Sequence, residues 1–196
     1  GHAIKLVEEF IDEDMLIVYP DALIDVDLEV IAEEDVDGII WCQEVDDPEN
    51  FGVVAYDENR NITEILEKPA EPPSNFVNIG LYYIRDYKSM FAMIDMLYER
   101  EIKAKGEYNL VDAFDLMANN GKELKAYRVE GWHNCGSIPD TLRTNKTFCE
   151  RAQKENRSSV AEGAIVDTST LFNCIILENS RIIDSDLESS IIGANS

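Results

Sequence analysis

The sequence predicts an α/β fold with a mostly parallel sheet, followed by the start of a parallel β-helix. Between residues 3 and 155, short apolar runs typical of buried strands alternate with amphipathic stretches typical of helices, which is the pattern of parallel α/β sheets. From about residue 158, short apolar groups recur every five to six residues between small polar residues. That period is typical of a parallel β-helix.

The elements of the first part follow in chain order. Apolar side chains at three- and four-residue spacings predict an amphipathic helix at 3–11. The segment DENRN at 57–61 is a turn between two strands, and Gly121 ends a helix. We expect strands at 15–19, 38–44, 51–56, 62–66, 76–84 and 124–129, and helices at 87–99, 108–119 and 139–155.

Residues 160–196 supply the second part. In a β-helix, one face of each short strand turns inward and stacks on the coil below, and about two coils fit in this segment. An ordinary edge of β-strands is the alternative. We therefore expect one domain at 1–157 and a second, hexapeptide-repeat domain at 158–196.

The composition excludes some functions. The 196 residues include 17 Lys and Arg and 40 Asp and Glu, so the net charge is −23. Nucleic acids and anionic membranes are bound through Lys and Arg, so neither is an expected partner. Four cysteines, at positions 42, 135, 149 and 174, form no C-x-x-C pair, and no apolar run approaches the ~20 residues of a membrane span. We expect a cytoplasmic protein without structural zinc.

Short motifs follow one another in a fixed order: F-G-V-V, E-K-P, S-N, G-L-Y, K-G-E and W-x-x-C-G. They lie in LIVYPDALID (16–25), the long stretch 46–84, KGEYNLVDA (105–113) and GWHNCGSIPDTLRTN (131–145). Together these stretches resemble the sugar-1-phosphate nucleotidyltransferases, in particular the glucose-1-phosphate thymidylyl- and uridylyltransferase-like enzymes. The resemblance implies a Rossmann-like sheet, truncated at its N-terminus, and a left-handed β-helix.

The resemblance also implies the reaction. An oxygen of a hexose 1-phosphate, expected to be glucose 1-phosphate, attacks the α-phosphorus of dTTP or UTP and displaces pyrophosphate. Charge develops on phosphate oxygens, so Mg²⁺ and cationic side chains would be the main catalytic groups. The implied partners are the nucleoside triphosphate, the sugar 1-phosphate and further copies of the chain.

Two residues resemble the metal ligands of the family. Asp21, at the end of a strand, corresponds to its first metal-binding aspartate, although Pro20 stands where the family has glycine. Asn134 stands in W-x-N-x-G where the family has a second carboxylate, and it offers an oxygen without a charge. A turn residue after a strand is the alternative for Asp21.

Glu67 and Lys68 resemble the pair that binds the sugar phosphate. Lys68 would meet the phosphate as a point charge, and Glu67 would accept hydrogen bonds from sugar hydroxyls. Asp21 and Lys68 are therefore the expected catalytic residues. The alternative for Glu67 and Lys68 is an exposed ion pair at a strand end.

Four further positions resemble contacts to the sugar. Gly52 and Gly80 would let the backbone approach it closely, Tyr82 would line its pocket, and Lys105 would lie near its phosphate. The alternatives are β-bulges for the two glycines, a core position for Tyr82 and a surface position for Lys105.

The family binds triphosphate through a loop of the form G-G-x-G-T-R-L, and this motif does not occur in the chain. We therefore expect the chain to be an inactive fragment of a transferase. The alternative is a non-catalytic relative that serves assembly or regulation, which Pro20 and Asn134 favour. A hexapeptide-repeat acyltransferase is disfavoured, because no histidine follows His133.

Overall fold

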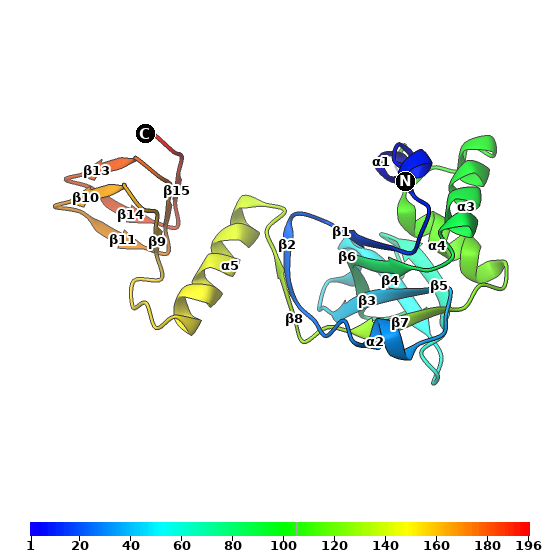
Figure 1. The fold of residues 1–196 in the computed structure, drawn as a ribbon. Coiled ribbons are helices and arrows are strands. Elements are labelled where there is room, and N and C mark those ends of the chain that lie inside the picture. The colour runs from blue at the N-terminus through cyan, green and yellow to red at the C-terminus, as the bar shows by residue number, and fades with distance from the viewer. Residues whose placement is uncertain (105) are drawn as a thin grey trace. The chain divides into compact units, whose positions relative to one another are not determined.

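The computed structural model describes residues 1–104 and 106–196 (Figure 1). They form two compact units, the first of residues 1–20 and 24–132 and the second of residues 21–23 and 133–196. The boundary falls inside two paired strands, β2 (Ala22–Asp25) and β8 (Gly131–Asn134). No helix among the described residues is long and apolar enough to cross a membrane.

The first unit is built on a six-stranded mixed sheet in the order β5-β4-β6-β3-β7, with β1 also paired to β6. Its strands are β1 (Met15–Val18), β3 (Gly38–Glu44), β4 (Gly52–Tyr56), β5 (Ile62–Glu67), β6 (Phe76–Ile84) and β7 (Leu124–Arg128). The pair β3–β7 is parallel. The pairs β1–β6, β3–β6, β4–β5 and β4–β6 are antiparallel.

The prediction of a mostly parallel sheet is therefore wrong, although the α/β class is confirmed. Parallel neighbours need a crossover of about a dozen residues or more, usually a helix. The turn 57–61 joins β4 to β5, and the segment 68–75 joins β5 to β6 without a helix. Asp57 closes the predicted turn by accepting from the N–H groups of Asn59 and Asn61.

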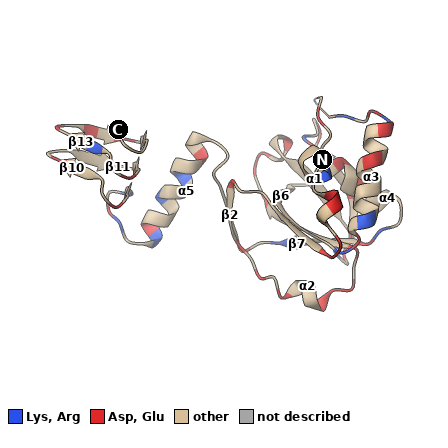
Figure 2. Ribbon diagram, turned by 45° about the horizontal axis from the view of Figure 1, so that its top comes forward, with Lys and Arg blue, Asp and Glu red and all other residues tan. Residues whose placement is uncertain are grey.

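Helices cover one face of this sheet and a short segment covers the other. Along β3, Ile40 and Cys42 point to one face and Ile39 and Trp41 to the opposite one, as the period of a strand requires. The first face packs against α3 (Tyr87–Glu99) and α4 (Leu110–Asn119), which lie side by side (Figure 1). The second face packs against residues of the segment 24–31, whose last two residues are the start of α2 (Val30–Glu33). The short helix α2 carries an acidic residue (Figure 2).

The predicted helix at 3–11 is shorter than expected. The structure has α1 (His2–Lys5) and a separate 3₁₀ turn, η1 (Glu8–Phe10). Leu6 and Phe10 are 65% and 73% exposed, so their apolar face lacks the packing that stabilises a short helix. The short 3₁₀ turn η2 (Pro48–Asn50) precedes β4.

The second unit contains α5 (Ile138–Arg151) and a stack of short strands (Figure 1). The strands are β9 (Ser159–Val160), β10 (Ile165–Asp167), β11 (Thr170–Phe172), β12 (Ile175–Ile176), β13 (Arg181–Ile183), β14 (Asp186–Glu188) and β15 (Ile191–Ile192). They form the parallel sheets β9-β12-β15, β10-β13 and β11-β14. The predicted parallel β-helix is confirmed, and its left hand stays a prediction.

Each coil of this β-helix is 16 residues long. Residues that pair between successive coils, such as Ile165 with Arg181 and Ile175 with Ile191, lie that far apart in the sequence. The corners between strands are residues with positive φ, which Asn and Asp adopt more readily than most residues. Two corner pairs 16 residues apart are joined by hydrogen bonds of 3.3 and 3.4 Å, Asn173 to Ser189 and Asn179 to Asn195. The positive-φ corners are Gly163, Thr168, Asn173, Asn179, Asp184, Ser189 and Asn195.

Candidate functional site

The ends of β4 and β5 bring three of the expected sugar-binding residues together. Gly52, the first residue of β4, pairs with Glu67, the last residue of β5. Lys68 follows with φ 47°, and its N–H donates to the carbonyl of Phe51 at 2.9 Å. Such a φ is uncommon outside glycine, and strained positions of this kind cluster at functional sites. The side chain of Lys68 is 42% exposed, with Nζ 3.7 Å from Glu67 Oε1.

An asparagine that none of the short sequence motifs contains holds this corner. Asn78 on β6 donates to the carbonyl of Gly52 at 2.9 Å and accepts from the hydroxyl of Tyr82 at 2.5 Å. Tyr82 is fully buried, with its ring against those of Tyr19 and Phe114. Burial raises the pKa of Tyr82 well above its ordinary value, so the hydroxyl stays a donor. Tyr82 therefore reaches the corner through Asn78.

Gly80 occupies an irregular position of β6. Its φ is +80°, and a methyl group there would lie 2.7 Å from the ring of Tyr19. The register of β6 against β3 shifts across this position. This geometry matches the alternative reading of Gly80 as a bulge residue.

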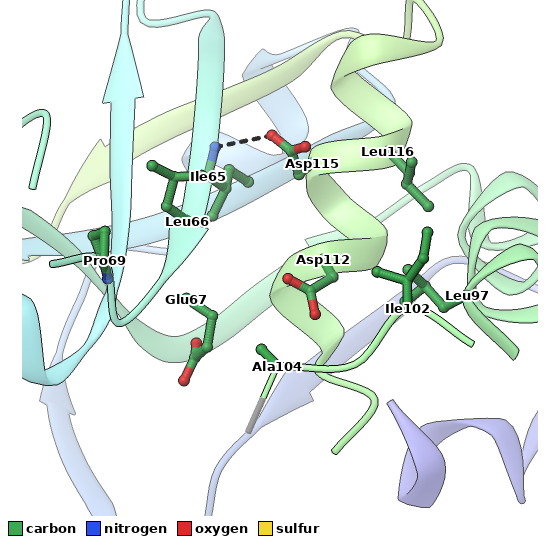
Figure 3. Close-up of a pocket in the computed structure, with 10 residues that line it drawn as sticks. All are labelled: Ile65, Leu66, Glu67, Pro69, Leu97, Ile102, Ala104, Asp112, Asp115 and Leu116. Atoms are coloured by element: carbon green, nitrogen blue, oxygen red, sulfur yellow. Dashed lines mark hydrogen bonds between the residues drawn. The ribbon is translucent and has the colours of Figure 1, made fainter. Parts of the chain in front are cut away.

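A cavity of about 420 Å³ lies beside Glu67, between β5 and α4 (Figure 3). The carboxylates of Glu67 and Asp112 point into it, and Asp115 accepts from the N–H of Ile65 at 3.2 Å. Burial raises the pKa of Asp112, whose Oδ2 has no hydrogen-bond partner among the described residues. Lys105 lies outside the described residues. The cavity is lined by Ile65, Leu66, Glu67, Pro69, Leu97, Ile102, Ala104, Asp112, Asp115 and Leu116.

The two expected metal ligands lie together in the second unit. The carbonyl of Asp21 accepts from the N–H of Cys135 at 2.7 Å, and Asn134 Oδ1 accepts from the N–H of Gly136 at 2.9 Å. A methyl group at Gly136 would lie 2.9 Å from Asp21 Oδ2 and 3.2 Å from Asn134 Oδ1. Both oxygens thus face the space that glycine leaves open.

This pair of oxygens suits Mg²⁺, which prefers oxygen ligands and commonly takes only one or two carboxylates from the protein. Three or more His, Cys, Asp or Glu residues placed to hold a metal do not occur in the part of the chain that the structure describes. Asp21 and Asn134 would therefore share the ion with phosphate oxygens and water.

The aromatic residues of the W-x-N-x-G motif have other contacts. Trp132 packs against the second face of the sheet and edge-on to Phe51 at 5.5 Å, which agrees with a core role. His133 Nε2 lies 3.2 Å from Arg151, and its ring lies edge-on to Phe148. Near the N-terminus, His2 Nδ1 lies 3.0 Å from the hydroxyl of Tyr98.

Residues 1–151 match the nucleotidyl transferase family. The bifunctional protein GlmU of Methanococcus aeolicus is 30% identical over 173 residues, which are 87% of this chain and 40% of that protein. The UTP–glucose-1-phosphate uridylyltransferase AglF of Haloferax volcanii is 31% identical over 138 residues, which are 67% of this chain and 55% of that protein.

A solved structure is similar as well. It is described as a glucose-1-phosphate thymidylyltransferase from Bacillus anthracis in complex with sucrose, with 26% sequence identity and a TM-score of 0.60. The match covers 79% of this chain and 60% of that one. The chain spans 39 to 47% of the length of the first curated relatives it matches.

Proposed function

Since residues 1–151 place the chain in the nucleotidyl transferase family, we propose that the whole protein is a sugar-1-phosphate nucleotidyltransferase. It transfers a nucleotidyl group from dTTP or UTP to a hexose 1-phosphate, glucose 1-phosphate first among them, and releases pyrophosphate. The observation that carries the proposal is the corner of Gly52, Glu67 and Lys68, where a cation and a carboxylate meet at a strand end.

Each residue has a role that its chemistry supports. Lys68 binds the sugar phosphate, and Glu67 accepts hydrogen bonds from the sugar hydroxyls. Gly52 is buried and leaves room for Asn78 beside the sugar, and Lys105 adds a second cation near the phosphate. Asp21 and Asn134 hold Mg²⁺, which would neutralise charge on the phosphate oxygens. The attacking phosphate oxygen is already ionised, so no side chain has to remove a proton.

The 196-residue chain lacks the glycine-rich triphosphate motif in its sequence, and we propose that it is inactive in transfer by itself. Residues 1–157 would carry the sugar-phosphate part, and residues 158–196 would serve assembly into homo-oligomers. The four thiols are free, which supports a cytoplasmic location. The second candidate function is a non-catalytic relative, favoured by the neutral Asn134 at a metal position.

The first test measures binding of glucose 1-phosphate to the chain by calorimetry. Lys68→Ala should weaken binding about tenfold, because a hydrogen bond to a charged group contributes about 1.5–3 kcal/mol. Lys88→Ala, which removes a lysine of α3 that lies over the ring of Tyr87, should leave the affinity unchanged. Equal affinities for glucose and glucose 1-phosphate would contradict the role of Lys68. Binding without pyrophosphate release by the whole protein would favour the non-catalytic candidate.

A further inference from the structure

The side chain of Asn134 is held at both ends. Its Nδ2 donates to Asp140 Oδ2 at 3.4 Å, and its Oδ1 accepts from the N–H of Gly136 at 2.9 Å. Its own carbonyl accepts from Thr144 Oγ1 at 2.8 Å, which ties the backbone of β8 to α5. All of these residues belong to the second compact unit.

The two contacts at the ends of the amide allow one orientation. The oxygen of an asparagine side chain only accepts hydrogen bonds, and its nitrogen only donates them. If the amide of Asn134 turned over, its NH₂ would face the N–H of Gly136 and its oxygen would face the carboxylate of Asp140. Both contacts would then be repulsive, so the oxygen remains on the side that Asp21 Oδ2 also faces.

Asp140 is itself fixed in the first turn of α5. Its Oδ2 accepts from Ser137 Oγ at 2.6 Å and its Oδ1 from Arg143 Nη1 at 2.8 Å. Its N–H donates to Ser137 Oγ at 3.3 Å, which is the cap of the helix. The carboxylate therefore has a defined position before any metal arrives.

We propose that Asp140 is a positioning residue, which orients Asn134 so that the amide oxygen and not the nitrogen faces a metal ion beside Asp21. The proposal rests on the proposed function, because it requires a cation at that place. It gives Asp140 a role beyond helix capping. It also accounts for the use of a neutral asparagine, whose value as a ligand depends on which end points at the metal.

The test follows binding of Mn²⁺ to the 196-residue chain by the loss of its free-ion paramagnetic resonance signal. Asp140→Ala should raise the dissociation constant about tenfold, the lower end of the loss caused by removing a partner of a metal ligand. Glu150→Ala removes another carboxylate of α5, which pairs with Arg157 at 2.8 Å, and leaves Ser137 and Asp140 in place. This control should change the dissociation constant less than about twofold.

A second set of measurements starts from the Asn134→Asp variant. It separates orientation of the Asn134 amide from a loss of structure and from general attraction of Mn²⁺ by negative charge. In the Asn134→Asp background there is no amide to orient, because both carboxylate oxygens can bind a metal. Asp140→Ala should there leave the dissociation constant unchanged or lower it, because it also removes the repulsion between two facing carboxylates, so that the two substitutions are strongly coupled. An equal loss in both backgrounds would overturn the proposal.

Two further outcomes distinguish the inference from the function on which it rests. If Asp21→Ala abolishes Mn²⁺ binding but Asp140→Ala leaves it unchanged, the positioning role is wrong and the metal site stands. If Asp21→Ala does not weaken binding, the metal site itself is wrong and the positioning role falls with it. In the first case the side-chain amide signals of Asn134 in a nitrogen-15 spectrum would also be unchanged by Asp140→Ala.

Discussion

At the scale of single residues, the corner of the sugar-phosphate site has no room for a side chain at position 52. A methyl group on Gly52 would overlap Nδ2 of Asn78 and lie 3.1 Å from a methyl of Val111. Asn78 would have to move, and its hydrogen bonds to Gly52 and Tyr82 would break. Gly52→Ala should lower the free energy of unfolding by about 2–4 kcal/mol and abolish binding of glucose 1-phosphate.

The control for this prediction is Gly121→Ala. A methyl group at Gly121 would meet nothing within 4 Å, although its φ of +81° makes any side chain unfavourable by about 1–2 kcal/mol. Urea denaturation should show the larger loss for Gly52→Ala, and sugar-phosphate binding should be unchanged in Gly121→Ala. Equal losses of stability would mean that backbone conformation, and not the contact with Asn78, decides the cost.

Single-residue roles could be predicted only where a motif marked them. The motifs F-G-V-V and E-K-P contain Gly52, Glu67 and Lys68, and the structure places these residues side by side. Asn78 could not be predicted, because a polar residue within an apolar strand usually indicates only that one face of the strand is exposed to solvent. Its partners lie 26 residues before it and 4 after it, and sequence alone does not show which of its ends meets which group.

At the scale of elements, α3 depends on one carboxylate at its start. Asp86 accepts from the N–H of Ser89 at 3.0 Å and from Lys122 Nζ at 2.5 Å. Burial alone would raise the pKa of Asp86, but the hydrogen bonds from Lys122 and Ser89 outweigh it and lower the pKa to about 2. The folded pKa therefore lies below the ordinary value of 3.8.

This difference fixes the sign of a pH effect. A carboxylate with a lowered pKa stabilises the fold above its unfolded pKa, and the stabilisation is lost as the pH falls through the folded value. We expect the wild-type chain to lose about 1–2 kcal/mol between about pH 5 and about pH 2 through Asp86, allowing for its partial exposure. Urea denaturation across this range should show a smaller loss in Asp86→Asn. Glu99→Gln, at the other end of α3, should keep the wild-type slope.

The positions of the helices and strands could be predicted better than the directions of the strands in the sheet. Apolar side chains recur along α3 and α4 at helical spacing, and both helices lie where they were predicted. The direction of a strand depends on whether its connection can cross the sheet, and the periodicity of β5 and β6 contains no information on that. The helix predicted at 3–11 was too long, because Leu6 and Phe10 in its middle and end are mostly exposed and do not pack against the core.

At the scale of the whole molecule, the described residues divide into two compact units with separate cores. We expect calorimetry to resolve two unfolding transitions, since each core can be lost without the other. Ile94→Ala removes a fully buried side chain of α3, and Ile176→Ala one that is 1% exposed in the β-helix. Each should cost about 2–5 kcal/mol and lower a different transition. A single transition lowered by both substitutions would contradict the division.

The order of motifs and the repeat were the whole-molecule features that sequence could predict. The match of residues 1–151 confirms the family, and the parallel sheets of β9–β15 confirm the β-helix. The number of residues in one coil could not be predicted from the sequence. The apolar groups are spaced by five or six residues, and a coil has three sides whose lengths must be summed. Only the pairing of strands and corners shows how many residues a full turn takes.

The coil is therefore the unit in which the length of the β-helix can change. Every corner recurs one coil further along the chain, so the insertion or deletion of a whole coil keeps each inward side chain above its counterpart. A deletion one residue short of a coil would instead place the neighbours of Leu171 and Leu187 inside the stack, where charged and polar groups cannot be solvated. The length of this part can thus change only in whole steps, and each step moves whatever the coil carries by one strand spacing of about 4.8 Å.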